Sequence, residues 1–170
     1  MSDETVPGLR VGILVLSDKG SRGEREDTSG PAIVSFLAGR DVVEPLLEIL
    51  PDDREIIARR LAAWADDLRL DVILTCGGTG VAPRDVTPEA TGDVIDREVP
   101  GFGERMRAVS FQKTPGALIS RALAGIRGGT LIVNLPGSPR AAAENLEAVW
   151  EAVPHLVAKL QGDDRDCGEA

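Results

Sequence analysis

Cysteine, aromatic residues and long apolar runs are scarce in this sequence of 170 residues. Of its two cysteines, Cys76 lies in an apolar run and Cys167 in a polar tail, which argues against a disulfide framework and fits a reducing cytoplasm. No apolar run approaches the roughly 18 residues that a membrane span needs. Residues 1–8 form a short polar segment that lacks the basic-then-apolar pattern of a signal peptide. We therefore expect a soluble, cytoplasmic protein with no membrane partner.

Positively charged residues are also fewer than negatively charged ones, 19 against 28. The net charge is −9 and the sequence pI is about 4.7, which disfavours nucleic acid as a partner because phosphate neutralisation dominates that affinity. Aromatic residues make up 3% of the chain and tyrosine is absent, so base-stacking surfaces are not expected either. If the ligand nevertheless carries phosphates, backbone N–H groups and a metal ion must help to neutralise them.

Histidine occurs once, as His155. With no second histidine and no Ser/His/Asp spacing, the sequence favours neither a zinc site nor a catalytic triad. Cys76 has no histidine near it in sequence to activate its thiol, so we interpret it as a buried strand residue.

The apolar pattern is typical of strands alternating with helices, which predicts one α/β domain with a doubly wound, mostly parallel sheet in three layers. We expect the domain at residues 9–161, with flexible ends at 1–8 and 162–170. Strands are predicted at residues 9–16, 42–50, 71–76 and 130–135. Helices are predicted to begin at Pro31, at Asp52 or Asp53, and at Pro88, Gly101 and Pro139. Residues 118–127 fit a short helix that runs into an edge strand, and Pro154 should kink or divide the last helix.

Ligands of such sheets bind outside the carboxyl ends of the strands. Three loops follow predicted strands at that edge: Ser17-Asp18, residues 77–85 and residues 136–139. The Gly77-Gly78-Thr79-Gly80 turn permits positive φ and close approach to a ligand, and its N–H groups can form an anion nest. It is neither a Walker loop nor a G-x-G-x-x-G fingerprint. The neighbouring charges at residues 24–27 read as solvated loop charge, whereas Ser17 and Asp18 are candidates to line a nucleotide pocket.

Two aspartates leave two interpretations open. Asp85 can stabilise the N-terminus of the helix at Pro88, where Thr87 is a candidate cap, and Asp52 can cap the helix that follows it. Alternatively, two aspartates at the carboxyl edges of neighbouring strands, beside a glycine-rich turn, resemble a Mg²⁺-phosphate site. The sequence pattern alone does not choose between them.

Four motifs in the same order resemble molybdopterin adenylyltransferases, a family whose domain also occurs in the scaffold protein gephyrin and in plant molybdenum-cofactor proteins. They are VGILVLSDKGSRGEREDTSG (residues 11–30), GGTGVAPRDVTPEAT (77–91), VPGFGERMR (99–107) and LISRALAGIRGGTLIVNLPGSP (118–139). The resemblance spans residues 11–160. One departure is Cys76, where many relatives are expected to carry threonine.

The resemblance implies a trimeric α/β enzyme that transfers AMP from Mg-ATP to the terminal phosphate of molybdopterin and releases pyrophosphate. It implies ATP and molybdopterin as substrates, Mg²⁺ as cofactor, and a transient contact with a molybdenum insertase. The two functionally important aspartates of the family match Asp52 and Asp85, which would hold Mg²⁺ and the triphosphate. The matching binding residues are Gly77, Gly78, Thr79, Gly80, Ser120, Pro136, Gly137, Ser138 and Pro139, and Arg84 or Arg121 would add positive charge.

Three other functions stay open. The first is a molybdopterin- or cofactor-binding protein of the same fold without efficient adenylyl transfer. The second is an interaction module, because fused relatives serve as scaffolds. The third is a stand-alone piece of a molybdenum insertase, although this chain is too short for the further domains of those proteins.

Overall fold

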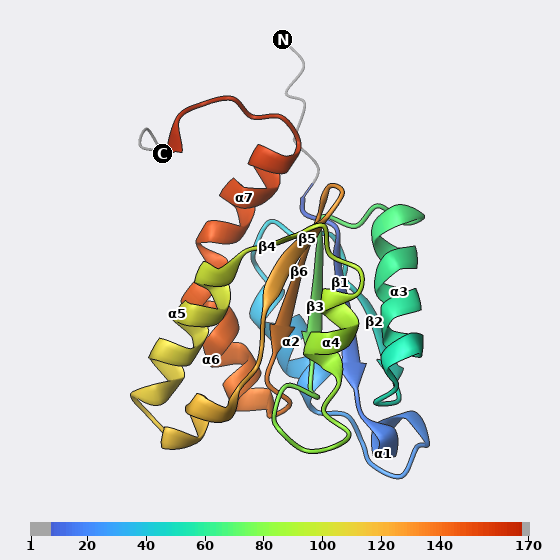
Figure 1. The fold of residues 1–170 in the computed structure, drawn as a ribbon. Helices are drawn as coiled ribbons and strands as arrows, with labels where there is room; N and C mark the ends of the chain where they lie inside the picture. Colours follow the sequence, from blue (N-terminus) through green and yellow to red (C-terminus); the bar gives the residue numbers. More distant parts are fainter. Residues whose placement is uncertain (1–7, 168–170) are drawn as a thin grey trace.

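A six-stranded sheet forms the middle layer of the computed structural model, which describes residues 8–167 (Figure 1). The strand order is β2-β1-β3-β6-β5-β4. The first four are parallel: β2 (Leu46–Leu50), β1 (Val11–Leu16), β3 (Val72–Cys76) and β6 (Thr130–Leu135). Strand β5 (Ala124–Arg127) runs antiparallel to β6, and β4 (Arg97–Glu98) runs antiparallel to β5.

Helices cover both faces of this sheet. One face packs against α2 (Ser29–Leu37), α5 (Pro100–Phe111), α6 (Pro139–Trp150) and α7 (Ala152–Leu160), and the other against α3 (Arg54–Asp66) and α4 (Thr87–Gly92). The remaining short elements are α1 (Asp18–Ser21) and a 3₁₀ turn, η1 (Pro115–Ile119). The three-layer α/β fold expected from the sequence is confirmed.

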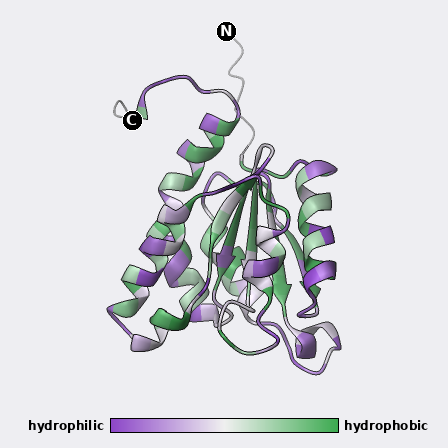
Figure 2. Ribbon diagram, in the orientation of Figure 1, coloured by the Kyte–Doolittle hydropathy of each residue, from purple (hydrophilic) through white to green (hydrophobic). Residues whose placement is uncertain are grey.

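The central strands are buried on both sides, which explains their nearly continuous apolar sequences. Every residue of β1, β3 and β6 is buried. Successive side chains alternate between faces, so Ile13 joins the core under α2 and α6 while Leu14 joins the core under α3. In Figure 2 the most hydrophobic ribbon segments accordingly lie in the sheet.

Four local expectations need correction. The strand predicted at residues 42–50 begins only at Leu46, and Val42 makes a single bridge to Leu9. Strand β5 is not at the edge, because the short exposed strand β4, which the sequence did not suggest, pairs outside it. The last helix divides at Glu151, ahead of Pro154, since proline is compatible with the first turn of a helix. The helix at Pro31 begins two residues earlier, at Ser29.

A buried amide fixes the site-bearing end of the sheet. Asn134 on β6 donates to the hydroxyls of Thr75 on β3, at 3.0 Å, and of Thr91 on α4, at 2.9 Å. Its carbonyl oxygen accepts from the backbone of Leu123. Because a buried polar group is costly unless it is paired, this network holds α4 in one position on the sheet.

The ends of the chain are only partly described. The expectation of flexible ends concerns residues 1–8 and 162–170, of which 1–7 and 168–170 lie outside the described residues. Between residues 8 and 167, no helix combines the length and apolar character required to cross a membrane.

Candidate functional site

The turn after β3 has the positive-φ backbone that its glycines permit. Gly77 has φ +109° and Gly78 has φ +66°, values that side chains rarely tolerate. The N–H of Gly77 is used inside the fold, where it donates to Leu135. Within the described residues, the N–H groups of Gly78, Thr79 and Gly80 donate to no protein acceptor, so these three remain for an anion nest.

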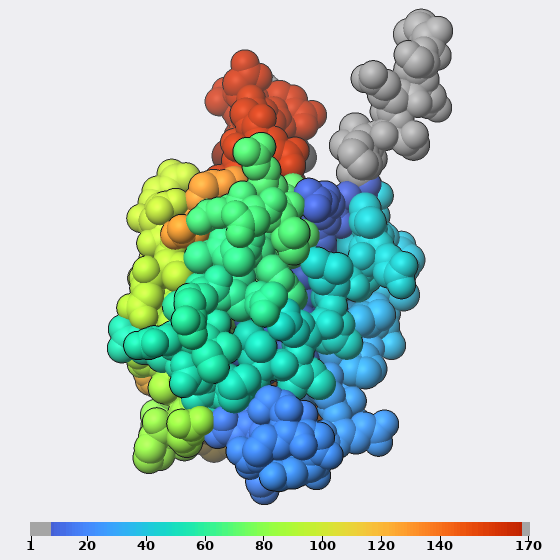
Figure 3. All heavy atoms as spheres, turned by 90° about the vertical axis from the view of Figure 1, so that its right-hand side faces the viewer, coloured from blue at the N-terminus to red at the C-terminus, as the bar shows by residue number. Residues whose placement is uncertain are grey.

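Two cavities open at the carboxyl edge of the sheet. The loop after β1 and the loop after β3 lie side by side at this edge (Figure 3). Arg84 of the second loop donates to Asp18 of the first. The first cavity, of about 390 Å³, contains both candidate aspartates. We call it the acidic pocket. Its lining includes Ser17, Asp52, Gly77, Gly78, Asp85, Gly137, Ser138 and Pro139, with residues 25–29 on one side.

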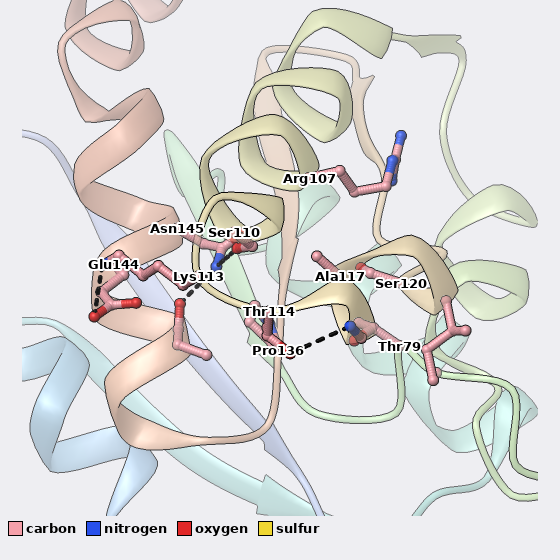
Figure 4. A pocket seen from close by; sticks show the side chains of 14 residues that line it. Thr79, Arg107, Ser110, Lys113, Thr114, Ala117, Ser120, Pro136, Glu144 and Asn145 are labelled. Carbon is pink, nitrogen blue, oxygen red and sulfur yellow. Dashed lines mark hydrogen bonds and ion pairs between the residues drawn. The ribbon is translucent and has the colours of Figure 1, made fainter.

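The second cavity, of about 260 Å³, lies between the glycine turn, η1, α5 and α6, and we call it the amide pocket. Figure 4 shows its side chains: Lys113 bonds to Glu144 on one side, and Asn145 donates to Ser110 next to them. Thr79 and Ser120 lie opposite (Figure 4). Hydroxyl, amide and carboxylate groups thus line a compact space that suits a ring rich in hydrogen-bonding atoms.

The same two turns contribute to both pockets. Gly77 and Gly78 line the acidic pocket, while Thr79 and Gly80 line the amide pocket. Likewise Pro136 lines the amide pocket, and the rest of the 136–139 turn lines the acidic one. The residues expected to form one site therefore form two adjoining cavities.

Asp52 is held by a reciprocal pair of bonds with Asp18. The N–H of Asp18 donates to the Asp52 carboxylate and the N–H of Asp52 donates to the Asp18 carboxylate, both at 3.0 Å. Burial raises the pKa of Asp52, and the nearby charges of Asp18 and Asp85 raise it further. The guanidinium of Arg84, bidentate on Asp18, lowers the pKa of Asp18. A desolvated carboxylate among other carboxylates is a group that a cation would stabilise.

Of the two candidates to cap the helix after residue 53, Asp52 is not the cap; Asp85 makes no capping bond to α4, although its charge lies next to the start of that helix. The cap of α3 is Asp53, whose side chain accepts from Ile56. Asp85 instead accepts from Ala82 at 2.9 Å inside its own loop. Thr87 is no cap either, because it lies within α4 and its hydroxyl donates to the carbonyl of Gly77.

Two backbone carbonyls of the turn at residues 136–139, those of Pro136 and Gly137, anchor it to the rest of the fold. The thiol of Cys76 donates to Pro136 at 3.2 Å, and the hydroxyl of Ser29 donates to Gly137 at 2.8 Å. Ser138 then caps α6 by accepting from Ala141. The start of α6, where backbone N–H groups attract anions, is thus fixed beside both pockets.

Burial raises the pKa of the Cys76 thiol to about 12. We therefore expect a thiol-specific reagent at mildly alkaline pH to modify only the exposed Cys167 in the folded protein and both cysteines after unfolding. Because the unfolded thiol ionises first, its contribution to stability should persist below its unfolded pKa near 9 and disappear as the pH rises toward about 12. Two fast-reacting thiols in the folded protein would contradict this assignment.

Several lining residues were not expected from the sequence. The segment 25–27, read there as solvated charge, lines the acidic pocket, and Asp27 accepts from the N–H groups of Ser29 and Gly30. The amide pocket adds Arg107, Ser110, Lys113, Thr114, Glu144 and Asn145. Only Asn145, an amide on the apolar side of a helix, carries a signal that sequence reasoning could have used.

Residues 12–155 match the family described as "Probable molybdopterin binding domain". The curated molybdopterin adenylyltransferase of Helicobacter pylori is 44% identical over 158 residues, covering 91% of this chain and 89% of that protein. The Escherichia coli enzyme of the same name is 42% identical over 151 residues, covering 88% and 77%.

Solved structures show the same similarity to proteins of molybdopterin biosynthesis. The molybdopterin biosynthesis enzyme MoaB from Thermus thermophilus has a TM-score of 0.86 and 54% identity, covering 91% of this chain and 98% of that one. The family match spans both pockets and the turns between them, and the two sequence relatives and this structure each cover about nine tenths of the chain. The chain therefore belongs to the molybdopterin-binding domain family of molybdenum cofactor biosynthesis.

Proposed function

We propose that the chain is a molybdopterin adenylyltransferase, which transfers AMP from ATP to the terminal phosphate of molybdopterin and releases pyrophosphate. The observation that carries the proposal is the pair of adjoining pockets with shared turns, one containing Asp52 and Asp85. Two substrates bound in these pockets would meet at the turns. The names of the curated relatives support the same activity.

We assign the triphosphate to the acidic pocket and the pterin to the amide pocket. Asp52 and Asp85 share the first with the glycine turn and the start of α6, both suited to phosphate oxygens. The amide pocket offers Asn145, Ser110 and Ser120 to the hydrogen-bonding edge of a pterin.

The donors fit Mg²⁺ as cofactor. Mg²⁺ is usually held by one or two carboxylates together with substrate phosphates, and Asp52 and Asp85 supply two carboxylates in one cavity. No cluster of three or more metal-binding side chains occurs among residues 8–167, so phosphate oxygens of the substrate and water would complete the coordination. When bound there, Mg²⁺ would offset the charge of the phosphates and of the departing pyrophosphate.

The reaction needs little proton transfer. The terminal phosphate of molybdopterin is already an anion, and one of its oxygens forms the new bond to the α-phosphorus of ATP. The bond from that phosphorus to the bridging oxygen breaks, and pyrophosphate leaves with the electron pair. The barrier lies in bringing anions together in line, and the free N–H groups of residues 78–80 reduce their repulsion.

Three further assignments rest on the family resemblance. We infer a homotrimer, a transient contact with a molybdenum insertase that takes the adenylylated product, and a cytoplasmic location. The two unpaired cysteines support the last of these.

The direct test supplies purified protein with molybdopterin, ATP and Mg²⁺. The proposal predicts pyrophosphate and adenylylated pterin in equal amounts, and neither product when molybdopterin is left out. Tight pterin binding without pyrophosphate would instead identify a cofactor-binding protein of the same fold. Binding of neither substrate would favour an interaction module.

A further inference from the structure

Arg121, which follows η1, is hydrogen-bonded to the segment at residues 79–85, which contributes to the lining of both pockets. Its backbone N–H donates to the carbonyl of Thr79 at 2.8 Å. Its guanidinium donates from Nε to Gly80 and from Nη2 to Asp85, both to backbone carbonyls and both at 2.7 Å. The third nitrogen, Nη1, pairs with the carboxylate of Glu89 on α4.

These bonds join the two ends of the loop at residues 80–85. The loop is also tied internally, because Asp85 donates from its backbone to Ala82 and accepts from the N–H of Ala82 with its side chain. A planar guanidinium can reach the carbonyls of Gly80 and Asp85 and the carboxylate of Glu89 at once, whereas an ammonium group cannot reproduce that fixed fork.

The carboxylate of Glu89 is held in its ion pair with Arg121. Arg121 lowers the pKa of Glu89, so its carboxylate stays ionised. The other oxygen of Glu89 is buried, with no hydrogen-bond partner in the described part of the chain. Because α4 is itself fixed by the Asn134 network, Glu89 offers Arg121 a stationary anchor.

We propose that Arg121 is a positioning residue, which fixes the carboxylate of Asp85 in the acidic pocket by holding both ends of the loop at residues 80–85. Three of its donors are directed at protein acceptors, so its contribution is structural order at the site rather than a free positive charge for phosphate. Its effect on turnover rests on the proposed adenylyl transfer, in which Asp85 orients the triphosphate.

The test combines Arg121→Lys with Asp85→Asn in a double-mutant cycle of pyrophosphate release. Lysine keeps a charge beside Glu89 but loses the fork. We expect R121K to lower kcat about 10- to 100-fold, since small displacements at a reacting centre have effects of this size. In the D85N background the same change should alter kcat by less than about 3-fold, because the two residues act through one another.

Arg127→Lys is the matched control. Arg127 also donates from three guanidinium nitrogens, two to the carboxylate of Asp66 and one to the backbone carbonyl of Val94, but it lines neither pocket. R127K should lower the melting temperature about as much as R121K and leave kcat within about 2-fold of wild type. A general loss of stability would lower kcat in both variants alike, whereas a loss of positioning would lower kcat in R121K alone.

Amide hydrogen exchange gives a readout that needs no activity. We expect exchange at Ala82 and Asp85 to be at least about 10-fold faster in R121K than in R127K, because the ends of their loop are released. Should R121K not fold, Glu89→Gln, which loosens the same guanidinium, takes its place in both measurements. Unchanged exchange, or an equal loss of kcat with and without Asp85, would overturn the inference. If the wild-type protein releases no pyrophosphate while exchange is still faster in R121K than in R127K, the proposed function is refuted and the loop assignment stands.

Discussion

Replacing Asp85 by asparagine should lower the rate of adenylyl transfer by about 100- to 1,000-fold, the usual loss when one preorganised electrostatic group is removed from a reacting centre. The fold should survive, because the asparagine oxygen can still accept from the N–H of Ala82. The charge is what disappears, and with it one of two carboxylates suited to orienting a cation and the triphosphate in the acidic pocket. Steady-state pyrophosphate release at saturating substrates measures the effect.

Asp53→Asn is the control for this variant. Asp53 is the immediate neighbour of Asp52 but caps α3 through Ile56, and asparagine caps a helix as well as aspartate does. D53N should therefore keep wild-type turnover and stability. If D85N turned over at a near-normal rate, Asp85 would have no part in the chemistry.

A methyl group at Gly77 should be among the most damaging single changes in the chain. Its Cβ would lie 2.5 Å from the backbone oxygen of Leu16, on a residue with φ +109°. No rotamer change relieves a clash with backbone, so β1 and β3 must separate or the turn must flip. Overpacking and positive-φ strain together cost about 2–5 kcal/mol, which corresponds to a loss of roughly 5–20 °C in melting temperature for Gly77→Ala.

Gly101→Ala provides the comparison. A Cβ at Gly101, in the first turn of α5, meets nothing within 4 Å, and the residue does not have positive φ. Alanine there should be neutral or stabilise the protein by up to about 1 kcal/mol. Thermal unfolding followed by circular dichroism distinguishes the two variants. Equal melting temperatures for them would show that the turn after β3 tolerates a side chain.

Much of the fold could be predicted from local sequence because its central strands are unusually apolar. Runs such as VGILVL and TLIVNL are short, apolar and rich in β-branched residues, which is typical of strands buried on both faces of a sheet. Strand β4 escaped prediction because Arg97 and Glu98 are exposed, and only backbone pairing to β5 makes them a strand. The actual start of β2 was missed for a related reason, since pairing with β1 begins only at Leu46.

The site was predictable to the level of its turns and aspartates, but not to the level of its partners. Glycine pairs after strands and acidic residues before helices are visible in sequence, and the structure brings Asp52 and Asp85 into one pocket beside Gly78. By contrast, the bonds of Arg84 to Asp18 and of Arg121 to Gly80 join segments far apart in the chain. Which acceptor a long side chain reaches depends on tertiary packing, so these contacts have no local signature in the sequence.

The most direct test of the account is a crystal structure with Mg²⁺ and an ATP analogue that resists cleavage at the α-phosphorus. The account predicts the triphosphate between the glycine turn and the start of α6, with a cation about 2.0–2.1 Å from a carboxylate oxygen of Asp52 or Asp85. A triphosphate bound in the amide pocket or elsewhere, with both aspartates facing only solvent, would contradict it.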